Sequence, residues 1–318
     1  MSRRALGPAT LAVVQAVAAA LEPTDTALLV ACSGGPDSLA LAAGVAHVAR
    51  GAGLPYAAVV VDHGLQEGSA AVAAQAEQAL VALGYADVRV ARVEVVADGS
   101  GPEAAARDAR YAALRTASAA RGATLLLGHT RDDQAETVLL GLARGSGARS
   151  LAGMAVRDGK RVRPLLALPR STTHACCAEL GLHPWTDLHN ADPAYARVRV
   201  RDRVLPALEA ELGPGVPAAL ARSAGLLRAD ADLLDRLADE AAPAVHRDGG
   251  LDCARLAALP TALRTRVLHG WLRTRGVRAL TADHVAAVDA LVTGWHGQGP
   301  AHLPGLRVAR TDGVLRSL

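Results

Sequence analysis

Six residues that directly follow an apolar run have the composition of an anion-binding loop. Residues 27–32 are apolar, and after them come Ser33-Gly34-Gly35-Pro36-Asp37-Ser38. Two glycines let the backbone bring several N–H groups close to one anion, and the start of a following helix adds partial positive charge. Asp37 suits such a site when a divalent cation accompanies phosphate groups. The pattern predicts a strand, a phosphate-binding loop and a helix, with magnesium beside Asp37.

A second group of ionisable side chains follows the apolar residues 123–127. Its members are His129, Asp132, Asp133 and Glu136, and Gly128 directly precedes them. If a helix begins near Asp132, then Asp132 and Glu136 lie one turn apart on the same face. Carboxylates at a helix start can simply cap it. Beside a phosphate-binding loop they can also hold a metal shared with Asp37, or bind a cationic amine.

Arginines gather in two further stretches. Arg107 and Arg110 either offer positive charge to a phosphate or form a solvated helix face. Four others alternate along the chain, at Arg197, Arg199, Arg201 and Arg203. In an extended segment these four share one face, whereas a helix distributes them around its surface. Residues 144–203 contain eleven basic and five acidic residues, although the whole chain carries only +3. This concentration favours a polyanionic partner.

The elements that must position these residues alternate between strand and helix. We expect strands at 27–32, 56–61, 88–96 and 123–127, and helices at 11–21, 37–50, 69–83, 102–120 and 132–143. Such alternation is typical of an α/β fold with a doubly wound parallel sheet. Ligands bind such sheets at the carboxyl ends of the strands. The clusters at 33–38, 62–65 and 128–136 all lie at such ends.

The remaining chain predicts a change of architecture. Residues 1–206 form the nucleotide domain, which includes a hairpin around Asp158-Gly159, a helix at 171–180 and a polar loop at 183–195. Residues 207–318 form a second, mainly helical domain with a terminal hairpin. Its expected elements are helices at 216–241, 259–275 and 281–292, with Thr281 as an N-cap, and a turn at Asp312-Gly313. We expect Trp271 and Trp295 to be core residues.

Composition excludes several classes of protein. The chain has 318 residues, of which 51% are hydrophobic and none is Phe. Its four cysteines show no CxxC spacing, which argues against a cysteine zinc site or a redox pair and fits a reduced, cytoplasmic setting. No apolar run reaches the length of a membrane span.

The loop at residues 33–38 resembles the signature of the PP-loop ATP pyrophosphatases, which cleave ATP to AMP and pyrophosphate while adenylating a carbonyl oxygen. Over about residues 25–208 the chain is more specifically similar to the tRNA(Ile)-lysidine synthetase family. The stretches that carry this similarity are 62–65, 107–111, 128–137, 144–147, 153–154, 163–166 and 185–201. The chain departs from the family pattern at Gln66, His189 and Val198.

The resemblance implies a reaction with ATP, Mg²⁺, free L-lysine and a tRNA(Ile) that carries the CAU anticodon. Lysine is joined to carbon 2 of the wobble cytidine after the oxygen on that carbon has been adenylated. The loop 33–38 then binds pyrophosphate, and Asp37 and Asp133 are the expected magnesium ligands.

The resemblance also implies roles for the other motif residues. Asp132, Asp133 and Glu136 position lysine or act as a base, and Arg107 and Arg110 face the adenylate phosphate. The nucleotide pocket is lined by His63, Gly128 and His129. The residues expected to bind tRNA are Arg144, Arg197, Arg199, Arg201 and Arg203, together with the helical C-terminal domain.

Other functions stay open from the sequence. A tRNA thiolase of the same superfamily normally needs paired cysteines, and Cys176 and Cys177 are adjacent in sequence. A non-catalytic nucleotide- or RNA-binding protein has no need for carboxylates at 37, 132, 133 and 136. The sequence does not decide the oligomeric state, and a homodimer is one candidate.

Overall fold

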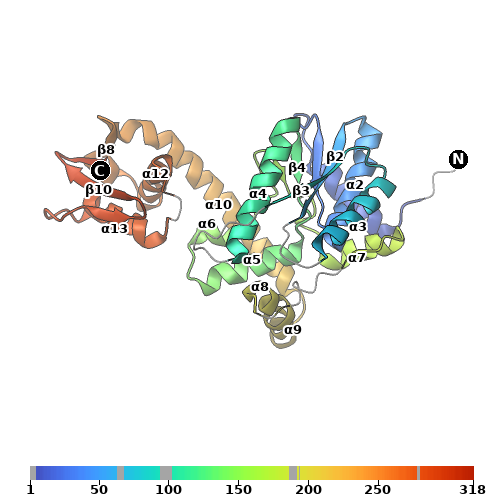
Figure 1. Cartoon of the computed structure of the whole chain (residues 1–318). Coiled ribbons are helices and arrows are strands. Elements are labelled where there is room, and N and C mark those ends of the chain that lie inside the picture. The colour runs from blue at the N-terminus through green and yellow to red at the C-terminus, as the bar shows by residue number, and fades with distance from the viewer. Residues whose placement is uncertain (1–4, 63–67, 94–101, 186–191, 193, 278–279) are drawn as a thin grey trace. The chain divides into compact units, whose positions relative to one another are not determined.

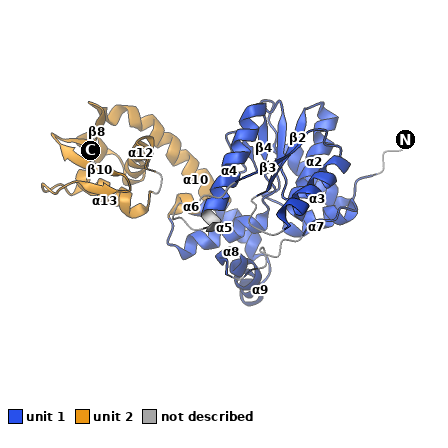
Figure 2. Cartoon of the chain, in the orientation of Figure 1, with its two compact units in different colours: residues 1–146, 151–224 blue, residues 147–150, 225–318 orange. Residues whose placement is uncertain are grey.

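The computed structural model describes residues 5–62, 68–93, 102–185, 192, 194–277 and 280–318. The chain forms two compact units, each with its own core (Figure 2). The first unit contains residues 1–146 and 151–224, and the second contains residues 147–150 and 225–318. Within the described ranges, no helix has both the length and the hydropathy needed to cross a membrane.

The first unit is built on a six-stranded sheet with the order β3-β2-β1-β4-β6-β5. The predicted parallel strands are confirmed as β1 (Leu28–Ala31), β2 (Tyr56–Asp62), β3 (Val88–Arg92) and β4 (Thr124–Leu126). The short β6 (Arg161–Val162) continues the parallel order, and β5 (Arg157–Asp158) pairs with it as the predicted hairpin. Because β1 lies between β2 and β4, the strand order reverses there, which is where such sheets bind ligands.

Helices cover both faces of this sheet (Figure 1). They are α1 (Pro8–Ala20), α2 (Pro36–Ala52), α3 (Ser69–Ala82), α4 (Pro102–Arg121), α5 (Arg131–Ala143) and α7 (Arg170–Glu179). Alternate residues of β1 serve different cores: Leu28 and Val30 pack with residues of α2 and α3, whereas Leu29 packs with residues of α4. Helices α1, α2 and α7 pack against one another. The doubly wound architecture expected from the sequence is confirmed.

The alternating arginines lie on helix, not on an extended strand. Residues 196–212 form α8 (Ala196–Arg199), a π-helical segment (Val200–Val204) and α9 (Leu205–Leu212). Val200 and Leu205 are buried against Ala135 of α5, which gives this segment an apolar contact at helical spacing. A helix therefore distributes the four arginines around its surface, the second of the two arrangements that the sequence allowed.

The long α10 (Val216–Val245) runs from the first unit into the second, and α6 (Ala148–Leu151) is a single turn. The second unit contains a five-stranded antiparallel sheet with the order β7-β8-β11-β10-β9. Its strands are β7 (His246–Arg247), β8 (Gly250–Asp252), β9 (Ala301–Leu303), β10 (Leu306–Thr311) and β11 (Val314–Ser317). Helices α11 (Cys253–Ala258), α12 (Thr261–Thr274) and α13 (Ala282–Thr293) complete it.

Several local predictions for the second unit are confirmed. Asp312 and Gly313 both have positive φ, as a tight hairpin turn requires, and the Thr281 side chain caps α13. Trp271 is buried, but the prediction for Trp295 was wrong because this side chain is 40% exposed. It follows the end of α13, where the Arg310 guanidinium lies 5.3 Å from its ring centroid. The sequence indicated only the terminal hairpin of the sheet and missed β7, β8 and β9.

Candidate active site

The predicted phosphate-binding loop joins the end of β1 to the start of α2. Gly34 has φ of +83°, and Gly35 is the N-cap residue of α2. The Ser38 hydroxyl accepts a hydrogen bond from the Ser33 N–H (3.2 Å) and donates one to the Gly35 carbonyl (2.9 Å). Ser38 therefore stabilises the shape of the loop, and the exposed Ser33 side chain stays available to a ligand. The geometry is that of an anion site at a helix N-terminus.

Two glycines allow close contacts around this loop. A Cβ atom on Gly34 would lie 3.2 Å from the Cβ of Ala76 in α3. A Cβ atom on Gly128, just beyond β4, would lie 2.9 Å from the backbone oxygen of Asp37 and 3.1 Å from the backbone nitrogen of Ser38. The two loops that carry the motifs therefore touch through their backbones, as expected for neighbouring strand ends.

Asp37 points toward α7. Its carboxylate accepts a hydrogen bond from the Thr173 hydroxyl, and its Oδ2 lies 3.5 Å from the Nε of Arg170. Burial raises the pKa of Asp37, and Thr173 and Arg170 offset only part of that effect. Asp37 is therefore a partly buried carboxylate whose charge is stabilised mainly by the first turn of α7.

The start of α5 places two further carboxylates beside Asp37. The Oδ2 atom of Asp133 accepts hydrogen bonds from the backbone N–H (2.8 Å) and the hydroxyl (2.9 Å) of Thr130, which forms a capping box. Burial acts to raise the pKa of Asp133, but Arg170 and the Thr130 N–H outweigh it and leave this pKa below its ordinary value. Asp132 accepts the backbone N–H of Arg170 at 2.8 Å. Both carboxylates thus also support structure: Asp133 caps α5, as the capping interpretation expected, and Asp132 holds the first residue of α7.

Glu136 is fully buried and is surrounded by guanidinium groups. Its Oε1 lies 3.3 Å from Nη2 of Arg170 and 3.1 Å from Nε of Arg201, and its Oε2 lies 2.9 Å from Nε of Arg197. Burial raises the pKa of Glu136, and so does the nearby Asp133 carboxylate, whereas the three arginines lower it. Glu136 therefore links α5 to α7 and to the helical segment at 196–204.

His129 lies among positive charges and is neutral. Burial lowers the pKa of His129 to about 3, and Arg163, Arg197 and Arg110 act in the same direction. Its Nδ1 atom is buried and has no hydrogen-bond partner within the described part of the chain. Arg107 and Arg110 lie 5.1 and 5.4 Å from the ring centroid of Tyr111. A neutral imidazole beside several guanidinium groups is a suitable surrounding for an anion.

The structure separates the four alternating arginines into two pairs. Arg197 and Arg201 face Glu136, whereas Arg199 and Arg203 are exposed. Arg144 is also exposed, at the C-terminal end of α5. Val198 is buried, so the departure from the family pattern at this position fills a core site. His63, Gln66 and His189 lie outside the described residues.

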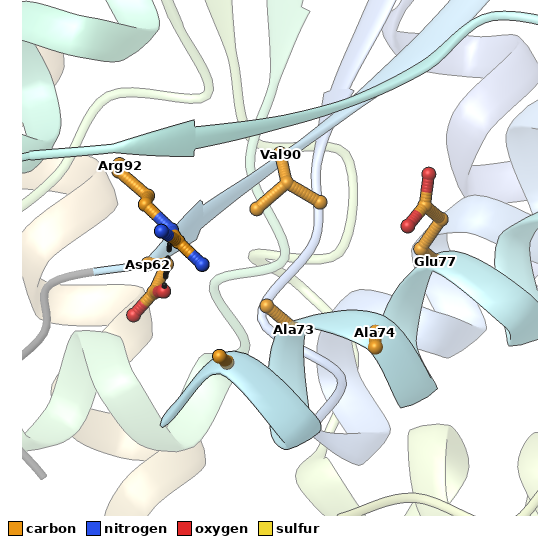
Figure 3. A pocket seen from close by; sticks show the side chains of 7 residues that line it. Asp62, Ala73, Ala74, Glu77, Val90 and Arg92 are labelled. Carbon is orange, nitrogen blue, oxygen red and sulfur yellow. Dashed lines mark ion pairs between the residues drawn. The ribbon is translucent and has the colours of Figure 1, made fainter. Parts of the chain in front are cut away.

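A pocket of about 420 Å³ lies at the carboxyl ends of β2 and β3 (Figure 3). The Oδ2 atom of Asp62 and the Nε atom of Arg92 are 3.7 Å apart on one side, and Glu77 stands on the other. Ala73 and Ala74 of α3 form part of its wall, one turn from the alanine that contacts Gly34. Helix α3 therefore contributes both to this pocket and to the surroundings of the predicted phosphate-binding loop.

The carboxylates suit magnesium as a companion of bound phosphate. No cluster of three or more His, Cys, Asp or Glu that could hold a metal occurs among the residues that the structure describes. Asp37 and Asp133 nevertheless each direct one oxygen at the same guanidinium, so these two hard donors converge. Magnesium is commonly bound by one or two carboxylates plus phosphate oxygens and water. The donor set fits that arrangement.

Sequence reasoning missed three side chains of this site. Arg170 and Thr173 come from α7, and Arg163 follows β6. Arg163 is buried, which lowers its pKa, and it donates to the backbone oxygen of Ala155 at 2.8 Å. Arg163 stands in a stretch that carried the family similarity, so a signal was present there. No spacing rule linked Arg170 or Thr173 to the loop.

Comparisons with known proteins agree with this geometry. A family model described as a PP-loop domain matches residues 10–208, and one described as the TilS substrate binding domain matches residues 251–316. The tRNA(Ile)-lysidine synthase of Salinispora tropica is 54% identical over 99% of this chain and 98% of its own length. That of Thermobifida fusca is 56% identical over 91% of this chain and 90% of its own length.

A solved structure shares the fold. The U34-tRNA thiolase NcsA from Methanococcus maripaludis matches with a TM-score of 0.57 and 20% identity, covering 69% of this chain and 80% of that one. The thiolase carries an iron–sulfur cluster. In this chain the four cysteines are free and buried. The likeness therefore concerns architecture alone.

Proposed function

The chain belongs to the tRNA(Ile)-lysidine synthase family, and we propose that the residues gathered beyond β1 and β4 are the site at which it performs that family's reaction. It is an ATP-dependent ligase that forms lysidine on tRNA(Ile). The observation that carries this conclusion is the identity of more than half of all residues along almost the entire chain. The assignments of single residues that follow are our proposal.

The chemistry explains why the site needs charge and positioning. The oxygen on carbon 2 of cytosine is a poor leaving group until adenylation converts it to AMP. The amine of lysine can then attack carbon 2 and expel AMP. No step requires a covalent nucleophile from the protein, so correct placement of the reactants and stabilisation of charge supply the rate enhancement.

We assign the triphosphate of ATP to the loop at residues 33–38. The support is the helix N-terminus, the positive φ of Gly34 and the exposed hydroxyl of Ser33. Asp37 and Asp133 would hold magnesium, which neutralises phosphate charge when bound. The pocket beside α3 is our candidate for the nucleoside, because the Asp62 carboxylate can accept hydrogen bonds from ribose hydroxyls.

We assign the adenylate phosphate to the region of His129 and Arg110. His129 is neutral because burial lowers its pKa to about 3, so it can donate one ring N–H and accept at the other nitrogen. Arg110 supplies positive charge that burial leaves poorly screened. Arg107, which is exposed on the same helix, is a weaker candidate for this role.

Lysine remains to be placed among the carboxylates at the start of α5. Glu136 already faces three guanidinium groups, so an ammonium ion reaches it only when one of them moves. Asp132 and Asp133 are less buried than Glu136. We therefore propose that Asp132 and Asp133 contact the cationic substrate first, and that Glu136 acts as their buried support or as the base.

The test is transfer of labelled lysine to a CAU-anticodon tRNA(Ile) transcript with ATP and magnesium. The methionine tRNA with the same anticodon and an Asp37→Ala protein are the controls. We expect label on the isoleucine tRNA alone and none with the variant. Pyrophosphate release that depends on tRNA but gives no lysine incorporation would retain adenylation and reject lysine as the nucleophile. Absence of both signals would reject the proposed reaction.

A further inference from the structure

One side chain outside the predicted motifs contacts all three inward-facing carboxylates of the site. The guanidinium of Arg170 lies 3.5 Å from Oδ2 of Asp37 through Nε, and its Nη2 lies 3.0 Å from Oδ1 of Asp133 and 3.3 Å from Oε1 of Glu136. The Arg170 side chain is only 20% exposed. A single cation is therefore shared by carboxylates from α2 and from α5.

The second oxygen of each carboxylate has a different partner. Thr173 donates to Asp37, Thr130 donates to Asp133, and Arg197 faces Glu136. Every carboxylate is thus held at two points, and Arg170 is the point common to all three. Two contacts per group fix both the position and the rotation of a carboxylate, which a single hydrogen bond does not do.

The common partner also solves an electrostatic problem. Three carboxylates gathered from two helices repel one another, and burial makes the repulsion stronger because water screens it less. Glu136 has no exposed side-chain surface, so an unpaired charge there would strongly destabilise the fold. A planar guanidinium with five donors can satisfy several carboxylates at once, whereas the single ammonium of lysine cannot match that geometry.

We propose that Arg170 is a positioning residue of the reaction: it joins the phosphate-binding loop to the start of α5 and holds Asp37, Asp133 and Glu136 at the spacing that the reactants require. This inference rests on the proposed function of the site. Arg170 acts through the carboxylates, and its contribution is geometric because misplacement of catalytic groups by about 1 Å can cost about 100-fold in rate.

The chain allows the guanidinium to be removed with little other change. The backbone N–H of Arg170 donates to Asp132 at 2.8 Å, and this bond is independent of the side chain. Position 170 is the first residue of α7, where alanine is a good helix former. An Arg170→Ala variant therefore keeps the local backbone contacts and leaves a space the size of an alkylguanidinium.

The experiment is chemical rescue. We expect Arg170→Ala to remain folded and to lose about 100-fold in kcat for lysine transfer, with an unchanged Kd for tRNA. Ethylguanidinium at millimolar concentration should raise the kcat of the alanine variant at least tenfold. Equal concentrations of ammonium or sodium chloride should not raise it. Arg170→Lys, which keeps the charge without the planar fork, should recover less than the rescued alanine variant.

The matched control is Arg157, another arginine of the same unit that binds carboxylates. It pairs with Asp25 (2.6 Å) and Glu22 (3.0 Å), which precede β1 and so lie at the opposite end of the sheet. Arg157→Ala should lower the melting temperature. Addition of ethylguanidinium should not change the kcat of this variant. This variant separates loss of a stabilising ion pair from loss of a positioning group.

The outcomes distinguish the inference from the proposed function. If the wild-type enzyme transfers no lysine, both fail together. If the wild type is active and a folded Arg170→Ala protein equals it, or cannot be rescued, the inference alone fails. If Arg170→Ala does not fold, Arg170→Lys decides: wild-type kcat in that variant overturns the inference, and a loss of kcat with unchanged tRNA binding supports it.

Discussion

Asp37 illustrates how a functional carboxylate weakens the fold that carries it. Its pKa is raised, with burial as the largest cause. Because the folded-state pKa lies above the unfolded value, the ionised carboxylate lowers the free energy of unfolding, and this penalty is absent at low pH. It develops as the pH rises through the folded pKa, and it is complete above that value. At neutral pH the ionised Asp37 therefore destabilises the protein, and we propose that the cost is retained because the reaction needs the charge.

This sign gives a prediction for Asp37→Asn. At pH 7.5 the variant should lose lysine transfer but should melt no lower than the wild type, and we expect it to melt a few degrees higher. One pKa unit corresponds to about 1.4 kcal/mol, and 1 kcal/mol to about 2–4 °C for a unit of this size. The difference should vanish as the pH falls toward 4. Melting curves between pH 4 and 8 measure it.

Asp25 is the matched control because its environment has the opposite effect. Burial acts to raise the pKa of Asp25, but hydrogen bonds from Arg157, Glu22 and Thr124 outweigh it, so the pKa is lowered. Ionised Asp25 therefore stabilises the folded state. This stabilisation is present above the ordinary range of carboxyl pKa values and disappears as the pH falls through the folded pKa of Asp25. Asp25→Asn should therefore lower the melting temperature at pH 7.5. Equal shifts in both variants would contradict the assignment.

Gly128 gives a second prediction for a single residue. A Cβ atom there would lie 2.9 Å from the backbone oxygen of Asp37, and a backbone atom cannot move aside as a flexible side chain can. Gly128→Ala should push the start of α2 away from β4 and raise the KM for ATP at least tenfold. Gly51 lies near the end of α2, and a methyl group there has no atom within 4 Å. Gly51→Ala should therefore leave the KM for ATP unchanged and stabilise α2 slightly. Normal ATP affinity in Gly128→Ala would refute the argument.

Local composition revealed the loop residues but not their partners. Glycines, a proline and hydroxyl residues after an apolar run form a pattern within a dozen residues, so Gly34 and Asp37 could be found from the sequence. Arg170 and Thr173 come from a helix more than 130 residues farther along, and Glu136 meets Arg201 across 65 residues. Such contacts depend on how the helices pack, which no local spacing encodes.

At the scale of elements, the helix that includes residues 196–204 gives the alternating arginines two different roles. Residues four apart share a face, so Arg197 and Arg201 face Glu136 while Arg199 and Arg203 lie at the surface. We expect the exposed pair to contact tRNA phosphates and the inner pair to support the reaction site. The alternation in sequence is compatible with both strand and helix; burial of Val200 and Leu205 on α5 decides for helix.

The corresponding variants are Arg199→Ala/Arg203→Ala and Arg197→Ala/Arg201→Ala. The first should weaken tRNA binding about tenfold or more and reduce the slope of log Kd against log salt by up to about 2, with KM for ATP unchanged. The second double variant should lower kcat strongly and should change the slope of log Kd against log salt little. Anisotropy titrations with labelled tRNA at several salt concentrations give the slopes. Equal effects of both double variants on the slope would reject the division.

At the scale of the whole molecule, the fold class of the first unit could be predicted from the sequence, whereas that of the second unit could be predicted only in part. Long strands and helices in strict alternation specify a parallel sheet, and that part of the prediction is confirmed. The antiparallel sheet of the second unit includes β7, β8 and β9, which are two or three residues long. Strands of that length show no hydrophobic period, so their pairing arises from the packing of Leu251 and Leu303 into a common core.

The separate cores lead to a prediction about unfolding. Leu29 lies in the core between the sheet and α4, and Leu268 lies in the core of the second unit; both are fully buried. Truncation of a buried leucine to alanine costs about 2–5 kcal/mol. In calorimetry, Leu29→Ala should lower one transition and Leu268→Ala the other. ATP with magnesium at about 100 times its Kd should add about 2.7 kcal/mol to the first unit only.

Each variant controls for the other because the substitution is the same and only its location differs. If unfolding were a single cooperative event, both substitutions and ATP would shift one common transition. If the nucleotide bound outside the first unit, ATP would stabilise the transition that Leu268→Ala lowers. A shift confined to the transition that Leu29→Ala lowers would place nucleotide binding in the first unit by a measurement that needs neither tRNA nor catalysis, and it would do so even in variants whose lysine transfer has been lost.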